Sequence, residues 1–153
     1  MKNQLYPILP TPPLPPPPTA PIFDQPLFTR ITGYTPMENR TYHFHIYYDE
    51  GEKPAAQNVV AGVCEAFSLQ AGNFHDGPVG PHPTGSCQID VGMAQFGEVM
   101  DWLAFHREGL TVFIHGNSGD VLKDHSDHTI WMGRMMVLDL DMLRRFIAAK
   151  QKK

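Results

Sequence analysis

Histidine is the residue type in this sequence with the most chemistry to offer, because imidazole binds transition metals and transfers protons near neutral pH. The chain of 153 residues contains eight histidines, all after residue 40: His43, His45, His75, His82, His106, His115, His125 and His128. Neutral imidazole is a common ligand for iron, zinc, copper and nickel. The elements that carry these residues decide whether their rings can meet.

Four of the histidines are predicted to converge on one face of a sheet. His43 and His45 are two residues apart in the alternating segment 41–48, so both rings leave the same side of a strand. His115 ends a second alternating segment, on the side opposite its valine and isoleucine. His82 stands between two prolines, which restrict its backbone and could preorganise a ligand. The alternative is a set of exposed histidines on a solvated sheet face.

A polar loop at residues 117–128 adds His125 and His128 among three aspartates. A carboxylate beside an imidazole can orient its tautomer and raise its basicity. Either histidine is therefore a candidate acid–base group or metal ligand, and the alternative is an exposed polar loop. Trp131 follows this loop and either walls an aromatic pocket or belongs to the core. Two histidines are expected to take no part in a site: His75 and His106.

The elements that position these side chains follow from the hydrophobic pattern. Alternating segments predict strands, and apolar residues at i, i+3, i+4 and i+7 predict helices. Strands are expected at residues 41–48, 86–91, 110–115 and 129–132, and helices at residues 55–71, 94–108 and 139–150. The glycine- and proline-rich residues 73–84 are expected to be a loop. These elements indicate an α+β fold, an antiparallel sheet with helices on one face, although their order does not match a ferredoxin-like β-α-β-β-α-β fold.

Proline separates the chain into two parts. Eleven of the fifteen prolines lie in residues 1–36. Proline fixes φ and donates no backbone hydrogen bond, so residues 7–21 are predicted to be polyproline II or disordered. We predict a Pro-rich disordered N-terminal arm at residues 1–39 and a folded domain at residues 40–153. The arm is either a ligand for an SH3-type or WW-type domain or an unfolded extension.

Composition argues against several classes of function. Twelve basic and sixteen acidic residues give a net charge of −4, whereas nucleic-acid binding favours a basic face. No stretch approaches the roughly 18 continuous apolar residues that cross a bilayer. Two cysteines cannot make a disulfide scaffold, and the first residues show no secretory signal pattern. We expect a cytoplasmic protein that binds neither nucleic acid nor membranes.

Four segments carry most of these histidines in a fixed order: Thr41–Tyr48 (TYHFHIYY), Gly80–Pro83 (GPHP), Val112–Gly116 (VFIHG) and Asp124–His128 (DHSDH), the last followed by Trp131–Gly133 (WMG). Together they resemble the DOPA 4,5-dioxygenase family of small extradiol ring-cleaving enzymes, over about residues 40–140. The resemblance implies a ferredoxin-like sandwich and a homodimer. It also implies the use of non-haem Fe(II) and O₂ to open the ring of DOPA or a related catechol.

With this resemblance, each candidate residue receives a predicted role. The predicted metal ligands are His45, His82 and His115. The predicted catalytic residues are His125 as the acid–base group, His43 as a second-sphere base or alternative ligand, and His128, which could also contact the substrate. The predicted substrate contacts are Trp131 and Arg134, with Lys123 as an alternative cation for a substrate carboxylate.

Two alternatives stay open at this point. Extradiol sites commonly combine two histidines with one carboxylate, and the candidate carboxylates are Asp90, Asp124 and Asp127. A site made of histidines alone, or completed by water, is the alternative ligand set. The alternative function is a non-enzymatic α+β dimer that binds a metal or small ligand and recruits a partner through its Pro-rich arm.

Overall fold

The computed structural model describes residues 40–150, so the predicted arm at residues 1–39 lies outside the described residues. The elements, in chain order, are β1 (Thr41–Tyr48), the 3-10 turn η1 (Glu50–Glu52), α2 (Lys53–Phe67), β2 (Ala71–His75), β3 (Gly85–Gly92), α3 (Phe96–His106), β4 (Thr111–Gly116), α4 (Val121–Asp124), β5 (Thr129–Met132) and α5 (Leu140–Lys150). Within the described part of the chain, no helix is long and apolar enough to span a membrane.

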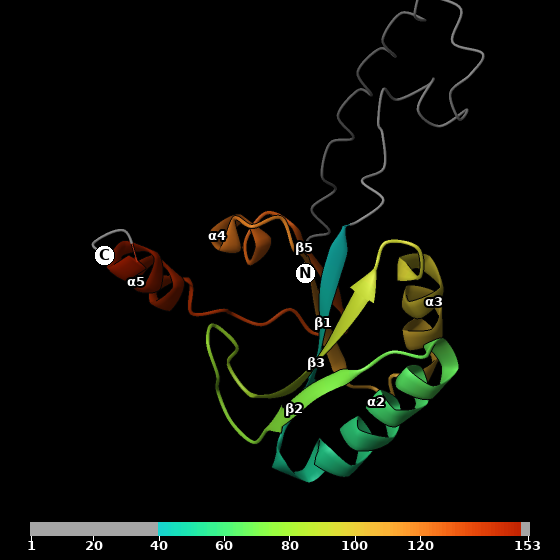
Figure 1. The fold of residues 1–153 in the computed structure, drawn as a ribbon. Helices are drawn as coiled ribbons and strands as arrows, with labels where there is room; N and C mark the ends of the chain where they lie inside the picture. Colours follow the sequence, from blue (N-terminus) through green and yellow to red (C-terminus); the bar gives the residue numbers. More distant parts are fainter. Residues whose placement is uncertain (1–39, 151–153) are drawn as a thin grey trace, which may run out of the picture. The chain divides into compact units, whose positions relative to one another are not determined.

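The strands form one antiparallel sheet in the order β2-β3-β1-β4-β5, with β1 at its centre. Helix α2 connects β1 to β2, and α3 connects β3 to β4. The first four strands and these two helices therefore have the β-α-β-β-α-β order of a ferredoxin-like fold, and β5 extends the sheet beyond β4. The predicted α+β class and the helices on one face of the sheet are confirmed (Figure 1).

The order of elements inferred from the hydrophobic pattern was wrong because β2 was missed. The helix predicted to continue to residue 71 ends at Phe67, where Ser68 takes a left-handed conformation with φ of 55°. Residues 71–75 then pair with β3 as an edge strand. Their sequence, AGNFH, does not alternate and is mostly exposed, so backbone pairing rather than hydrophobic periodicity makes it a strand.

One face of the sheet carries the hydrophobic core. Phe44 and Ile46 of β1 point toward the helices and are fully buried, as the alternation in β1 predicted. Helix α2 contributes Val59 and Val63, and α3 contributes Val99 and Leu103 at a spacing of four residues. Each side chain of this size contributes about 1.5–3 kcal/mol when it is fully buried. This packing fixes β1 as a rigid central strand.

The opposite face, which we call the histidine face, is defined by His43, His45 and Tyr47 of β1 with Phe113 and His115 of β4. These residues alternate with the core residues along both strands, and four of the five are buried. Pairing of β1 with β4 places His43 opposite His115 and His45 opposite Phe113. The predicted convergence of strand histidines on the face opposite the core is therefore what the sheet register produces.

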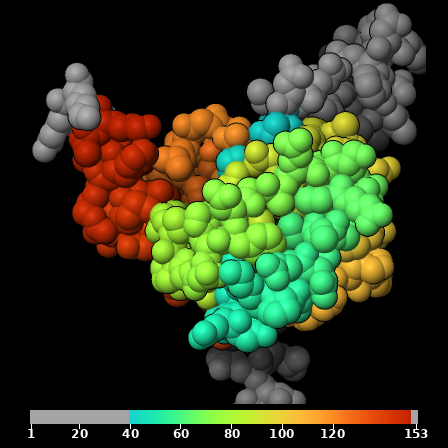
Figure 2. All heavy atoms as spheres, turned by 60° about the horizontal axis from the view of Figure 1, so that its bottom comes forward, coloured from blue at the N-terminus to red at the C-terminus, as the bar shows by residue number. Residues whose placement is uncertain are grey.

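The C-terminal part of the described chain borders the histidine face. Helix α5 begins where Asp139 accepts a hydrogen bond from the Met142 amide through Oδ1. The Asp139 amide in turn donates to the Pro81 carbonyl at 2.9 Å. Figure 2 shows α5, in red, beside the yellow-green segment before β3 and the orange segment around α4. The short α4 lies in a region predicted to be entirely loop.

Alanine at Gly85 is expected to destabilise the fold by about 1–3 kcal/mol, the usual cost of overpacking. A Cβ atom there would lie 2.8 Å from Tyr48 Cε2 and 2.9 Å from the Tyr48 carbonyl oxygen. Gly92, at the other end of β3, has nothing within 4 Å of such an atom and provides the matched control. Urea unfolding followed by circular dichroism measures both variants. Equal unfolding midpoints for Gly85→Ala and Gly92→Ala would contradict the packing argument.

Candidate metal centre

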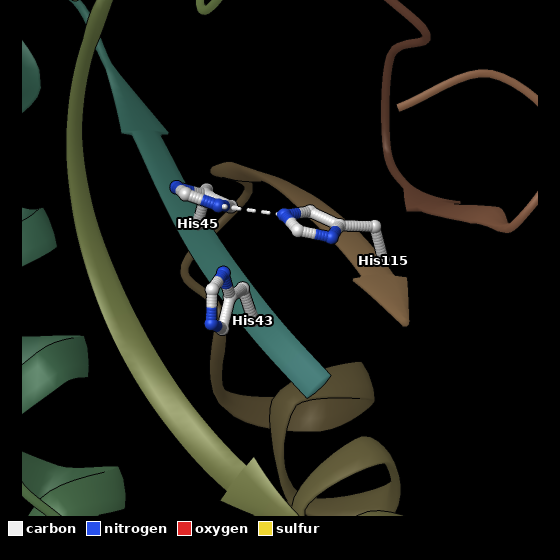
Figure 3. A group of neighbouring side chains, drawn as sticks. All are labelled: His43, His45 and His115. Carbon is white, nitrogen blue, oxygen red and sulfur yellow. Dashed lines mark hydrogen bonds between the residues drawn. The ribbon is translucent and has the colours of Figure 1, made fainter. Parts of the chain in front are cut away.

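Five imidazoles gather on and beside the histidine face, and we call them the histidine cluster: His43, His45, His82, His115 and His125. Three of them come from the paired strands β1 and β4, and Figure 3 shows these three rings grouped in front of the sheet. His82 comes from the loop before β3, and His125 comes from the turn after α4. Segments far apart in the sequence thus meet at one place.

The strand histidines lie within metal-binding reach of one another. The Nε2 atoms of His45 and His115 are 3.3 Å apart. One ring nitrogen from each of His43, His45 and His115 can be chosen so that all three lie within 4.8 Å of one another. The ring of His82 lies 4.0 Å from that of His45, centroid to centroid, and the ring of His125 lies 4.2 Å from that of His115.

Backbone carbonyls fix the tautomers of two cluster members. His115 Nδ1 donates to the Gly116 carbonyl at 2.8 Å, and His125 Nδ1 donates to the Val121 carbonyl at 2.9 Å. A carbonyl oxygen can only accept, so in each neutral ring the proton resides on Nδ1 and the lone pair on Nε2. This arrangement is typical of histidines that bind a metal or accept a proton through Nε2.

His82 has a different partner. Its Nδ1 atom lies 2.7 Å from the hydroxyl of Tyr47, which leaves its Nε2 atom free of this contact. Burial raises the pKa of the Tyr47 hydroxyl, so this group is a neutral phenol at physiological pH. The hydroxyl and the two prolines that flank His82 hold the imidazole in one orientation.

The electrostatics of the cluster favour neutral imidazoles. Burial, reinforced by repulsion between neighbouring histidines, lowers the pKa of His82 to about 3 and that of His45 well below 6.5. Burial also lowers the pKa of His115 to about 4, against the opposing effect of the Gly116 carbonyl. The pKa of His125 is lowered mainly by burial too. Because metals bind the neutral form, these rings need lose no proton to become ligands at pH 7.

A cavity of about 250 Å³ opens beside the cluster. Its lining includes His45 and His82 from the cluster, Ser86 and Gln88 from β3, and His75 at the end of β2. His75 was expected to take no part in a site. Its position in the cavity lining was not predicted, because the strand that carries it, β2, was not predicted. His106 lies on α3, stacked on Trp102 and exposed, away from the cavity.

The remaining predicted site residues lie outside the cluster. Trp131 of β5 lies directly opposite Phe113 of β4 and packs on it with ring centroids 4.7 Å apart, so it extends the aromatic surface of the histidine face. Arg134 lines a cavity of about 260 Å³ with Asp49 and Glu52. Lys123 lies 3.8 Å from Asp120. The substrate contacts predicted for these side chains stay predictions.

His128 faces different surroundings from His125, although the two lie in one loop. Its Nδ1 donates to Asp124 Oδ1 at 3.1 Å, and it lines a cavity of about 540 Å³ with Tyr42 and Ile130. Those two residues alternate with the histidine-face positions of their strands and therefore lie on the side of the sheet that carries the core. His128 is thus not part of the histidine cluster, although Asp124, which accepts its hydrogen bond, also acts electrostatically on His115 and His125.

Asp124→Asn is expected to lower the free energy of unfolding at pH 7, with the deficit shrinking as the pH falls below about 4. Burial opposes ionisation of Asp124, but hydrogen bonds from Ser118 and His128 outweigh it and lower the pKa of the carboxyl from 3.8. A carboxyl with a lowered folded pKa stabilises the fold above its unfolded pKa, and this contribution is lost as the pH falls through the folded value. Urea unfolding at several pH values measures the deficit.

The control for that experiment is Asp101→Asn, which changes an exposed carboxyl on α3. This variant should unfold like the unmodified protein at every pH. A deficit for Asp124→Asn that stays constant between pH 7 and about pH 2 would show that the charge of Asp124 is not what stabilises its surroundings.

The fold and the site define an α+β protein of ferredoxin-like topology with a histidine cluster on the sheet face opposite its core. A protein of this class has been solved from Nostoc punctiforme and provisionally assigned as a dioxygenase. The two structures superpose with a TM-score of 0.69 at 34% sequence identity, over 72% of this chain and 96% of the other. The present chain belongs to the Dopa 4,5-dioxygenase family, whose model matches residues 42–142.

The chain is also similar to two sequence relatives. A DOPA 4,5-dioxygenase from Amanita muscaria is 29% identical over 114 residues, which cover 67% of this chain and about half (49%) of that enzyme. An uncharacterized 21.2 kDa protein from Botryotinia fuckeliana is 30% identical over 143 residues, which cover 86% of this chain and 73% of the relative. Membership of the family indicates that the chain is a dioxygenase.

Proposed function

We propose that the protein is a non-haem Fe(II)-dependent extradiol dioxygenase that opens the ring of DOPA or a related catechol with O₂. The observation that carries the proposal is the group of three imidazoles, His43, His45 and His115, on paired strands beside a cavity. Family membership supports the reaction class. The substrate, the metal and the extradiol position of cleavage are the parts we propose.

The donor set fits a divalent transition metal. His45 and His115 bring their Nε2 atoms to 3.3 Å in a buried setting, where the His115 lone pair faces the His45 nitrogen and either a proton or a cation between them would be favourable. His43 supplies the third imidazole of the group. His82, predicted as a ligand from the sequence, stacks beside His45 and is available as a fourth imidazole. Imidazole ligands suit iron as well as zinc, copper and nickel.

Fe(II) bound by three imidazoles would supply a redox-active centre with positions left for a catechol and O₂. The protein's own residues would orient the substrate and move its protons. His125 is the proposed acid–base residue, because its Nδ1 proton is fixed by the Val121 carbonyl and its Nε2 lone pair can accept a proton from a catechol hydroxyl. Phe113 packs against both His115 and His125, with ring centroids 5.5 Å and 5.9 Å away.

The test is anaerobic reconstitution of the purified chain with Fe(II), followed by DOPA, caffeate and other catechols under air. We expect O₂ uptake and a yellow ring-opened product with at least one member of the panel. His106→Ala, which changes an exposed histidine outside the cluster, should behave like the unmodified protein. Stoichiometric iron without O₂ uptake across the panel would favour the non-enzymatic metal-binding alternative. Sedimentation of the same preparation tests the proposed homodimer.

A further inference from the structure

Asp90 on β3 lies directly opposite His43 on β1, and Gln88 lies directly opposite His45. The Asp90 Oδ1 atom lies 3.5 Å from His43 Nε2. The same oxygen accepts a 2.7 Å hydrogen bond from Gln88 Nε2. Two neighbouring positions of β3 on the histidine face thus combine to hold a carboxylate against one edge of the His43 ring.

The other edge of the His43 ring faces the cluster. In Figure 3, one ring nitrogen of His43 points toward His45 and His115, and the other points away from them. Because Nε2 is the atom beside Asp90, the nitrogen that faces the cluster is Nδ1. A proton on Nε2, attracted by the carboxylate, leaves the Nδ1 lone pair directed at the other two imidazoles.

Of the three strand histidines, only His115 has its tautomer fixed by a backbone carbonyl, so the tautomer of His43 must be set by another group. His115 has its proton fixed by a backbone carbonyl, whereas His43 has its Nε2 atom beside the Asp90 side chain. Asp90 itself is 68% exposed and lies on the outer side of His43. This position suits a residue that acts through an imidazole, as the carboxylates behind metal-bound histidines do, rather than a direct ligand.

We propose that Asp90, oriented by Gln88, is a positioning residue that fixes the Nε2–H tautomer of His43 and directs Nδ1 toward the metal. The metal belongs to the proposed function, on which this inference rests. The proposed tautomer does not depend on the metal, because it follows from the positions of the Asp90, Gln88 and His43 side chains alone. The proposed function and the proposed role of Asp90 can therefore be disproved independently of each other.

The first measurement is the tautomer of His43 in the metal-free protein, read from long-range ¹H–¹⁵N correlations of the imidazole at a pH where the ring is neutral. The unmodified protein should show mainly Nε2–H. Asp90→Ala should show a mixture of tautomers, and Asp90→Glu, which restores the carboxylate, should return the ring to Nε2–H. Asp101→Ala, which removes an exposed carboxyl on α3, is the control and should leave His43 unchanged. An unchanged tautomer in Asp90→Ala would overturn the proposal.

The second measurement is titration of the same proteins with Co²⁺, which reports binding through its visible absorption. Loss of an outer-sphere carboxylate should weaken binding about 10–100-fold in Asp90→Ala, with most of the affinity regained in Asp90→Glu. Unchanged Co²⁺ affinity in Asp90→Ala, or complete loss in both variants, would overturn a positioning role. If the unmodified protein binds no Co²⁺, the proposed function fails, and the tautomer measurement still decides what Asp90 does to His43.

Discussion

Alanine in place of His115 is expected to abolish metal binding and, with it, O₂-dependent turnover of a catechol, while the protein stays folded. The ring of His115 provides one of the two Nε2 atoms that approach to 3.3 Å, and its tautomer is fixed by the Gly116 carbonyl. Loss of an outer-sphere partner costs about 10–100-fold in metal affinity, so loss of a ligand should cost more than about 100-fold. Co²⁺ titration and an oxygen electrode measure the two effects.

The matched control for that substitution is His106→Ala, because His106 is an exposed imidazole bonded to the Trp102 carbonyl on α3. It removes the same side chain without touching the histidine cluster. Circular dichroism of both variants checks that the fold is kept. Metal affinity in His115→Ala within threefold of the control would exclude His115 as a ligand and would move the centre toward His82 and His125.

Leu103→Ala is expected to lower the free energy of unfolding by about 2–5 kcal/mol, the range for leucine truncated in a packed core. Leu103 is fully buried and belongs to the core between α3 and the sheet. Its loss leaves a cavity behind the same strands that carry the histidine cluster on their other face. Urea unfolding of the metal-free protein measures the effect without a contribution from bound metal.

Phe105, two residues further along α3, provides the control because its side chain is 80% exposed. Phe105→Ala should change the free energy of unfolding by no more than about 0.5 kcal/mol, as surface substitutions usually do. If Leu103→Ala and Phe105→Ala unfold at the same urea concentration, α3 does not contribute the packing that its burial implies.

Alternation along β1 and β4 was enough to predict which side chains face the helices and which face away. It placed Phe44 and Ile46 in the core and gathered His43, His45 and His115 on the opposite face. This prediction succeeded because successive side chains of a strand point to opposite faces of the sheet, whatever the order of the strands. Alternation alone thus assigned these histidines to one face, and the pairing of β1 with β4 brings their rings together.

The topology itself required information that the pattern does not contain. Residues 71–75 do not alternate, contain a glycine and lie at an edge, so their pairing with β3 is what identifies them as a strand. The same omission hid His75, which lines the cavity. The tautomers of His115 and His125 could not be predicted from the sequence either. They depend on the carbonyls of Gly116 and Val121 lying within hydrogen-bond distance of specific ring nitrogens.

The loop containing His125 and His128 shows why proximity in sequence predicts a site poorly. Both were candidates for the same acid–base role, yet one joins the cluster while the other bonds to Asp124. The intervening residues Ser126 and Asp127 close a turn through hydrogen bonds to the Lys123 carbonyl, which sends the two rings in different directions. The catalytic role of either residue stays a prediction.

The central place of β1 in the sheet gives the candidate centre two halves with different rigidity. Separating β1 requires two ladders of backbone hydrogen bonds to break together, so amide hydrogens around His43 and His45 should exchange with solvent among the slowest in the domain. His82 and His125 come from loops, where exchange is expected to be faster. Such a centre keeps one wall fixed while the other can adjust as a substrate enters and a product leaves.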